Sequence, residues 1–596
     1  MKPKSVFWNT IRRIVPIQFK STPIHNTIDI LLGAALGLTL TSNVIATQRL
    51  FDTITDVAMG RAGAWEWLMP LLVLTGVVFG TEIVQGVFNF QADVIFKKST
   101  GKIQMELYQK LQQIDPALYE NPAFLDDLNK AREGAGIIPY FCMSLFIMVS
   151  FYSVYFVSVG AYLFALKPLL LVTLLLSFLP AILGQVLRIN VFTKLQQESA
   201  PLRREFEYYK RTLCDREYFK ETRTLGAFRY FYVLFEETMR VFTRKQWSAE
   251  RKTALLQLVL NLTTFAGMGI TSIILFNATL ANEISVGAFA AVFAALRAIF
   301  SMMQQIVAGH IGNLNQNLGK VCNFIRLLDM PTRSGLDGVP DFSKGVVAED
   351  ASFTYWGRET PAVKSVSLSI DGNETIAIVG ENGAGKSTLV RLLTGIYRPF
   401  EGKVKVGGLD TTTTVPASVY KGISGVFQKV QRYKMTLEEN VALSDPYGMS
   451  LGIDHARIKM ALRKAGFQRD NLTLTTMLSP EYGGVDLSGG QWQRLAIARG
   501  LYRVNGFIVL DEPTAAIDPL EETQVYLQFQ KLAKDKCAIL VTHRLGSAKL
   551  ANRIIVMDAG KIVDMGTHEE LLARPGKYAD MYMTQAQWYM RGHDKI

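Results

Sequence analysis

Long apolar runs recur through the first 330 residues of the chain and then stop. A helix needs about 20 mostly apolar residues to cross the hydrocarbon core of a bilayer. Six segments meet this requirement: 30–48, 67–90, a stretch within 134–166, 168–187, a stretch within 253–282, and about 284–318. A short turn at residues 167–168 separates the third and fourth segments. The pattern therefore predicts an all-α membrane domain of six helices in which these two form a tight hairpin.

The connections 91–136 and 188–252 contain no apolar span, yet their apolar residues recur at helical spacing. We expect membrane helices two to five to continue beyond the bilayer as long extensions. A short turn or transverse helix would close each pair, near 119–127 and 215–222. Independent coiled segments are the alternative. Residues 7–19 suggest a helix lying in the membrane interface, with Trp8 on one side and basic residues on another.

The positive charges predict the orientation of this domain. If the N-terminus is cytoplasmic, the outer connections hold only Arg49, Arg61 and Lys167. The inner segments, 1–20, 91–136 and 188–252, then hold 26 Lys and Arg residues. Cytoplasmic loops of membrane proteins carry such an excess. We therefore expect a multi-pass protein of the cytoplasmic membrane with its N-terminus and C-terminal domain inside. This placement also explains the net charge of +12 without nucleic acid as a partner.

Composition agrees with a membrane domain joined to a globular one. Hydrophobic residues make up 49% of the chain and charged residues 19%, which excludes disorder as the main state. The four cysteines are far apart and form no zinc or redox pattern. A Pro-, Gly- and charge-rich stretch follows the sixth helix and reads as a linker. We expect four parts: an interfacial segment 1–22, the membrane domain 23–328, a linker 329–345 and a second domain 346–596.

The second domain contains a phosphate-binding loop. The β-branched run 376–380 predicts a buried strand, and it leads into GENGAGKST and then a helical pattern. This is the G-x-x-x-x-G-K-[ST] pattern in its strand–loop–helix setting. Lys386 is expected to bind β- and γ-phosphate oxygens, and Ser387 to ligate Mg²⁺. The residues expected to contact the nucleotide are Gly380, Glu381, Asn382, Gly383, Ala384, Gly385, Lys386, Ser387 and Thr388.

Two carboxylates follow a second apolar strand, FIVL at 507–510. Asp511 suits the Mg²⁺ shell, and Glu512 suits a general base that activates the attacking water. Between the two motifs, a helix start offers a second anion-binding end. Its residues are Ser488, Gly489, Gly490 and Gln491. The chain has two such helix starts but only one nucleotide site. The extra helix start is explained if it binds a nucleotide held by another subunit.

With these motifs in place, the whole chain resembles an exporter-type half-transporter of the ABC transporter family. The resemblance implies an α/β P-loop ATPase domain behind the six membrane helices, and it assigns further residues. Tyr355 matches the aromatic residue that stacks on adenine. Gln428, in GVFQK, matches the glutamine that contacts Mg²⁺ and the attacking water. His543, in VTHRL, matches the histidine that contacts the γ-phosphate. Residues 515–518 read AAID where SALD is more usual, and keep the aspartate.

The resemblance also implies a mechanism. Two ATP molecules bind between two nucleotide domains, whose closure moves the helix extensions and opens the cavity outward; hydrolysis at Glu512 resets the pump. One membrane domain per chain implies a homodimer, or a heterodimer with a related half-transporter. Residues 119–131 and 482–500 are similar to bacterial exporters of peptides, including lanthipeptides. Multidrug or lipid export is the alternative. The roughly 20 residues before the first helix are too few for a leader-cleaving peptidase domain.

Other functional classes make different demands on the sequence. A soluble ABC ATPase acting on nucleic acid would lack the six apolar segments. An ATP-gated channel or sensor would have the same architecture, but it would not need all the residues that catalyse ATP hydrolysis. Importers usually carry the two domains on separate chains. Within the spans, Glu82 and Arg297 lie at similar depths, which suggests either an ion pair or two charges that line a pathway.

Overall fold

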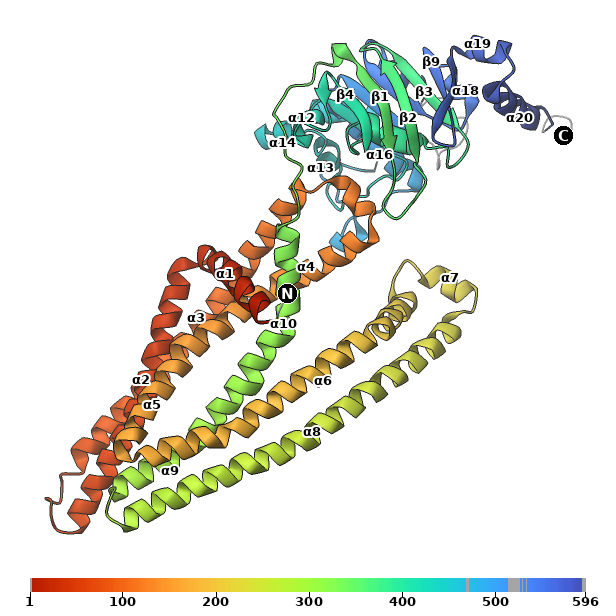
Figure 1. Cartoon of the computed structure of the whole chain (residues 1–596). Coiled ribbons are helices and arrows are strands. Elements are labelled where there is room, and N and C mark those ends of the chain that lie inside the picture. The colour runs from red at the N-terminus through yellow and green to blue at the C-terminus, as the bar shows by residue number, and fades with distance from the viewer. Residues whose placement is uncertain (1–2, 468–470, 513–525, 528, 532, 592–596) are drawn as a thin grey trace. The chain divides into compact units, whose positions relative to one another are not determined.

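The computed structural model describes residues 3–467, 471–512, 526–527, 529–531 and 533–591. The chain forms two compact units (Figure 1). One unit comprises Met1–Gln112 and Asp126–Met330, and the other comprises Gln113–Leu125 and Pro331–Ile596. The short segment Gln113–Leu125 therefore folds with the C-terminal unit. Our expected membrane domain, 23–328, had included it.

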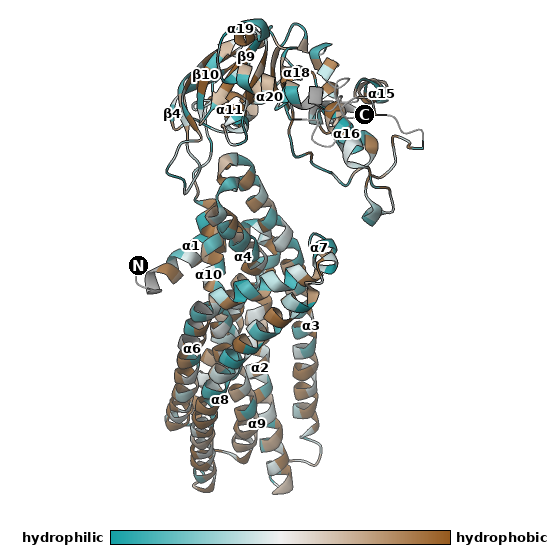
Figure 2. Ribbon diagram, turned by 90° about the vertical axis from the view of Figure 1, so that its right-hand side faces the viewer, coloured by the Kyte–Doolittle hydropathy of each residue, from teal (hydrophilic) through white to brown (hydrophobic). Residues whose placement is uncertain are grey.

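Unit one is entirely helical. Within the described residues, six helices are long and apolar enough to cross a membrane, as predicted. They are Pro23–Ala58, Leu68–Gln113, Pro122–Leu166, Pro168–Arg188, Phe228–Leu280 and Val286–Leu328. An additional helix, α1 (Pro3–Ser21), precedes them. Figure 2 shows apolar residues gathered in the lower part of the bundle in that view and polar residues along the extensions.

The extensions form a long helical pair. Helix α6 (Pro168–Cys214) and helix α8 (Phe228–Leu280) lie side by side along most of their length (Figure 1). Asp215 takes an extended backbone conformation and ends α6. The short helix α7 (Phe219–Thr224) then connects the pair and overlaps the predicted turn at 215–222, ending two residues later. On the other side of the bundle, α2 (Pro23–Ala58) and α3 (Leu68–Gln113) form the first two spans.

Two of the spans contain a π-helical turn. The third span consists of α4 (Pro122–Ile147), the π turn η2 (Met148–Tyr152) and α5 (Ser153–Leu166). The sixth consists of α9 (Val286–Gln304), the π turn η3 (Gln305–Ile311) and α10 (Gly312–Leu328). The Tyr152 hydroxyl donates to Gln305 Oε1 at 3.1 Å and joins the two π turns. Such turns each insert one residue into a helix and often mark functional positions.

The described residues of unit two form two sheets. The four-stranded sheet is antiparallel in the order β2-β1-β4-β5, and the six-stranded sheet has the order β10-β9-β3-β8-β7-β6. In the larger sheet all neighbours are parallel except β10 and β9. The strands are β1 (Val346–Phe353), β2 (Val363–Ile370), β3 (Thr375–Gly380), β4 (Glu401–Val406), β5 (Leu409–Asp410), β6 (Ile423–Val426), β7 (Phe507–Asp511), β8 (Cys537–Val541), β9 (Arg553–Asp558) and β10 (Lys561–Gly566).

Helices pack against the two faces of the larger sheet, and each face has its own core. Along β7, Phe507 and Val509 belong to one cluster, while Ile508 and Leu510 belong to the other. This alternation explains why FIVL has no polar residue. The helices in the part of this unit that the structure describes are α11 (Lys386–Leu393), α12 (Pro416–Val419), α13 (Leu437–Ala442), α14 (Pro446–Leu451), α15 (His455–Lys464), α16 (Gly489–Tyr502), α18 (Leu545–Ala548), α19 (His568–Ala573) and α20 (Lys577–Arg591), with single turns η4 (Phe342–Lys344) and η5 (Pro480–Tyr482).

The segment Gln113–Leu125 is tied to unit two by packing and by hydrogen bonds. Its short helix, η1 (Pro116–Glu120), is capped by Asp115, whose side chain accepts the Ala117 N–H. Ala117 is 2% exposed and belongs to the hydrophobic core around the four-stranded sheet. The Arg333 N–H donates to the Gln113 carbonyl at 2.7 Å. The transverse element predicted at 119–127 thus begins slightly earlier, because Asp115–Pro116 starts the turn.

Candidate functional site

The carboxyl ends of four adjacent parallel strands bring the predicted residues together. In register, Leu510 pairs with Val426 and Asp511 with Val541. The chain continues from these strand ends to Gln428, Glu512 and His543, while β3 continues into the phosphate loop. Ligands of open α/β sheets bind at this edge. A pocket of about 360 Å³ lies there. Its lining residues are Tyr355, Ala362, Asn382, Gly383, Gly385, Lys386, Ser387, Thr388, Gln428 and Glu512.

The phosphate loop requires glycine at defined positions. Gly385 caps the start of α11 with φ +99°, and a Cβ there would lie 2.4 Å from the Ala362 carbonyl oxygen. Gly380 ends β3, where a Cβ would lie 2.4 Å from the Met557 oxygen. No other residue fits these positions without moving backbone. The loop lines the pocket and leads directly into a helix N-terminus, which favours phosphate.

Lys386 is held at the centre of this loop. The residue is 5% exposed, and its ammonium donates to the Gly380 and Glu381 carbonyls at 3.0 and 3.1 Å. Its Nζ also lies 3.7 Å from Glu512 Oε1. A buried ammonium needs such acceptors, and phosphate oxygens can replace them. The Glu381 side chain points elsewhere, since it pairs with Lys577 at 3.3 Å.

Glu512 is the point at which the catalytic candidates meet. Its Oε2 accepts a hydrogen bond from Gln428 Nε2 at 2.9 Å, and its Oε1 lies 3.9 Å from His543 Nδ1. The pKa of Glu512 is lowered, first by His543 and also by Lys386. Its backbone has φ +44°, a strained conformation of the kind that clusters at active sites. Glu512 is thus an ionised carboxylate aimed into the pocket, as a general base must be.

Asp511 and Ser387 form an oxygen-rich pair beside this base. Asp511 is 5% exposed, and its Oδ1 lies 3.5 Å from Ser387 Oγ. Burial raises the pKa of Asp511, and the negative charge of Glu512 raises it further. No group of three or more His, Cys, Asp or Glu side chains able to hold a metal occurs among the described residues. The oxygen pair suits Mg²⁺, which typically takes one or two protein ligands together with phosphates and water.

Tyr355 also lines this pocket and is held by hydrogen bonds. Its hydroxyl lies 3.0 Å from Thr388 Oγ1 and accepts a hydrogen bond from Arg391 Nη1 at 3.3 Å. Arg391 was not among the predicted site residues, because it is one of several polar positions on a helix. Its position in α11, about one helical turn after Thr388, could have indicated that it lies near the site. Arg391 also donates to Tyr397 and to Glu120, at 2.7 and 3.2 Å.

The second predicted helix start lies outside this pocket. Ser488 caps α16, accepting the Gln491 N–H and completing a capping box with the Gln491 side chain. Ser488 and Gly489 are exposed, whereas the preceding Leu487 is buried. None of the lining residues of the nucleotide pocket belongs to this start. The predicted segment 515–518 lies outside the described residues.

Comparisons with known proteins agree with these features. The profile of the ABC transporter family matches residues 363–515. The chain is 29% identical over 526 residues to the subtilin transport ATP-binding protein SpaT of Bacillus subtilis, covering 86% of this chain and 84% of that protein. It is 26% identical over 601 residues to the ATP-dependent lipid A-core flippase of Haemophilus ducreyi, covering 97% and 98%. The structure of a bacterial Atm1-family ABC exporter with ATP bound aligns at a TM-score of 0.72 and 20% identity, covering 97% of this chain and 98% of that one, which shows a shared fold.

Proposed function

Since this chain is an exporter-type half-transporter of the ABC transporter family, with ATP hydrolysis coupled to transport, we propose that it exports a peptide across the cytoplasmic membrane as a homodimer. The convergence of Lys386, Gln428, Glu512 and His543 at one sheet edge carries the catalytic part of this proposal. The charge distribution of the loops supports an orientation with the N-terminus and the ATPase domain in the cytoplasm.

The proposed role of each residue follows from its geometry. Lys386 exchanges its carbonyl and carboxylate partners for β- and γ-phosphate oxygens when ATP binds. Glu512 then accepts a proton from the attacking water, which Gln428 helps to hold. His543 stabilises the γ-phosphate. Mg²⁺ would bind to Ser387 and Asp511, with Gln428 nearby, and would neutralise charge on the phosphates. Tyr355 stacks on the adenine ring.

The exposed start of α16 supports the homodimer. Ser488 and the glycines after it form an anion-binding helix start that lies outside the pocket of their own chain. In a symmetric pair, each start closes over the ATP held by the other chain. Because every catalytic position is present in this one sequence, two copies supply two complete sites.

The substrate class rests on the relatives. SpaT is described as a subtilin transporter, and the resemblance extends over most of both chains. Lipid is the second candidate, because the alignment with the lipid A-core flippase covers nearly the whole of both chains. Both alignments are long enough to include ATPase-domain residues as well as membrane-domain residues, so a transport measurement distinguishes the two substrates.

The test is vectorial transport by the purified protein in inside-out vesicles. ATP-dependent uptake of cationic amphipathic peptides, with matching stimulation of ATPase activity, is expected. Labelled phospholipids and multidrug substrates should be moved weakly, and Glu512→Gln should abolish uptake of all three. Lipid translocation without peptide uptake would replace the peptide proposal with the lipid one. ATP-dependent ion conductance without uptake would indicate a gated channel.

A further inference from the structure

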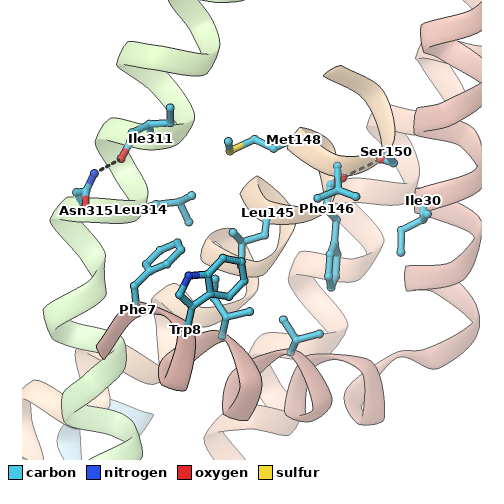
Figure 3. Close-up of a pocket in the computed structure, with 13 residues that line it drawn as sticks. Phe7, Trp8, Ile30, Leu145, Phe146, Met148, Ser150, Ile311, Leu314 and Asn315 are labelled. Carbon is cyan, nitrogen blue, oxygen red and sulfur yellow. Dashed lines mark hydrogen bonds between the residues drawn. The ribbon is translucent and has the colours of Figure 1, made fainter. Parts of the chain in front are cut away.

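An apolar pocket of about 570 Å³ lies within unit one, away from the nucleotide site. Its walls come from α1, α2, α4, the two π turns and α10. In Figure 3, Phe7 and Trp8 rise from α1, and Leu314 projects from α10 toward the same space. A volume of this size is ordinary for a site that holds a small organic molecule.

The lining of the pocket is apolar apart from Ser150 and Asn315. Ser150 Oγ donates to the Phe146 carbonyl at 2.8 Å, and Asn315 Nδ2 donates to the Ile311 carbonyl at 3.0 Å. Both donor groups are therefore used within their own spans. The pocket consequently selects for hydrocarbon rather than for a polar ligand.

The third span, which forms one wall of the pocket, packs closely against the first and sixth spans. The π turn η2 supplies Met148 and Ser150 to the pocket, and α2 approaches it at Gly33. A Cβ at Gly33 would lie 2.4 Å from Ser150 Oγ. Through Tyr152, η2 is also bonded to Gln305 of the facing π turn. The pocket is thus held by contacts among three spans.

The position of the pocket along the helices places it at one face of the bilayer. Met148 lies 18 residues from Leu166, the outer end of the third span, which corresponds to about 27 Å of helix. The hydrocarbon core is about 30 Å thick. In the orientation proposed above, on which this step rests, the pocket therefore opens at the boundary between acyl chains and headgroups of the inner leaflet.

Charge and exposure on α1 indicate the kind of molecule that enters. Trp8 is 68% exposed at the pocket, as expected for a residue of the membrane interface. By helical spacing, the exposed Arg12 lies beside Trp8 and Val15. Arg13 pairs with Asp329, whereas no carboxylate pairs with Arg12 in the part of the chain that the structure describes. A free guanidinium next to an apolar pocket complements an anionic headgroup.

We propose that this pocket binds one acyl chain of an anionic phospholipid from the inner leaflet, with the headgroup beside Arg12. The bound chain fills the space between α1 and the third and sixth spans. It thereby fixes the interfacial helix against the membrane domain. Nothing in this step requires the lipid to be transported.

The experiment is native mass spectrometry of the purified full-length transporter titrated with phosphatidylglycerol or phosphatidylcholine. Leu314→Trp and Ile11→Trp fill the pocket, and Leu179→Trp is the control, because Leu179 is an exposed apolar residue of α6 outside it. Each filling variant should weaken retention of phosphatidylglycerol by about tenfold, the effect of excluding roughly two methylene groups. The control should retain lipid as the wild type does.

Arg12→Gln tests the headgroup separately and changes only an exposed side chain. It should remove the preference for phosphatidylglycerol over phosphatidylcholine while leaving retention of phosphatidylcholine unchanged. Equal retention in the filling variants and the wild type would overturn the proposal. A cross-link from this pocket to peptide substrate or to the second subunit, rather than to lipid, would also overturn the proposal. Lipid retention is measured without ATP or transported substrate. A negative result would therefore contradict the lipid proposal without bearing on the export proposal.

Discussion

The carboxylate of Glu120 accepts a hydrogen bond from the Tyr397 hydroxyl at 2.8 Å, although 277 residues separate them. Arg391 Nη1 contacts the same carboxylate at 3.2 Å, and the Tyr355 hydroxyl at 3.3 Å. Burial, followed by the bond to Glu120, raises the pKa of Tyr397, so the phenol stays a donor. The segment between the second and third membrane spans is thereby connected to Tyr355, the residue proposed to stack on adenine.

We predict that Glu120→Gln raises the ATP concentration needed for half-maximal ATPase activity by a few fold. The amide keeps the size of the side chain but removes the charge that orients Arg391 and, through it, Tyr355. The pair is partly exposed, so the loss stays at about 1 kcal/mol or less. ATPase titrations measure the effect, with Glu359→Gln, an exposed Glu on a loop, as the control. An unchanged KM in Glu120→Gln would show that the network does not position Tyr355.

Glu512→Gln should bind ATP normally and hydrolyse it about 10²- to 10⁴-fold more slowly. The amide preserves the contact with Gln428 but cannot accept the proton of the attacking water. Single-turnover hydrolysis and binding of a fluorescent ATP analogue separate the two effects. Lys386→Ala is the contrasting variant, because it should lose nucleotide binding itself. Near-normal turnover in Glu512→Gln would assign the base elsewhere.

Ser488→Arg should block ATP-driven closure of the dimer while each chain still binds ATP. Loss of the Ser488 cap should cost about 1 kcal/mol, which leaves the domain folded. Ser488 is exposed, so the bulky cation extends from the surface and obstructs the partner's phosphates. Mixed dimers give the sharper measurement. A Ser488→Arg chain combined with a Lys386→Ala chain contains one intact composite site, whereas each parent homodimer contains none. ATPase activity should therefore appear only on mixing, and no recovery would argue against sites shared between chains.

Arg297→Ala should reduce substrate-stimulated ATPase activity and leave basal ATP binding unchanged. Arg297 and Glu82 are both exposed within their spans, and no ion pair joins them among the described residues. Charges in a span cost about 2.5–3.5 kcal/mol at its centre and usually face a pathway. Arg61→Ala, in the connection between the first two spans, is the control. Unchanged transport in both Arg297→Ala and Glu82→Ala would remove a substrate role for either charge.

The sequence predicted features that are encoded by neighbouring residues. The six spans follow from local hydropathy, and the site follows from motifs that each end a strand and therefore meet at one sheet edge. The π turns were not predictable, because one inserted residue hardly changes an apolar pattern. The role of Glu120 was not predictable either, since its partners lie more than 270 residues away and an acidic residue in a loop normally reads as solvent-exposed.

The burial of Ala117 within the core of unit two has a practical consequence for work on the ATPase alone. A fragment that begins at Pro331 would omit residues 113–125 and would leave the surface that Ala117 covers open to water. Its Arg391 and Tyr397 would also lose the Glu120 acceptor. Poor solubility or weak ATP binding in such a fragment would then reflect missing structure rather than an inherently slow enzyme. Fusing residues 113–125 back through a flexible linker should restore a self-contained domain.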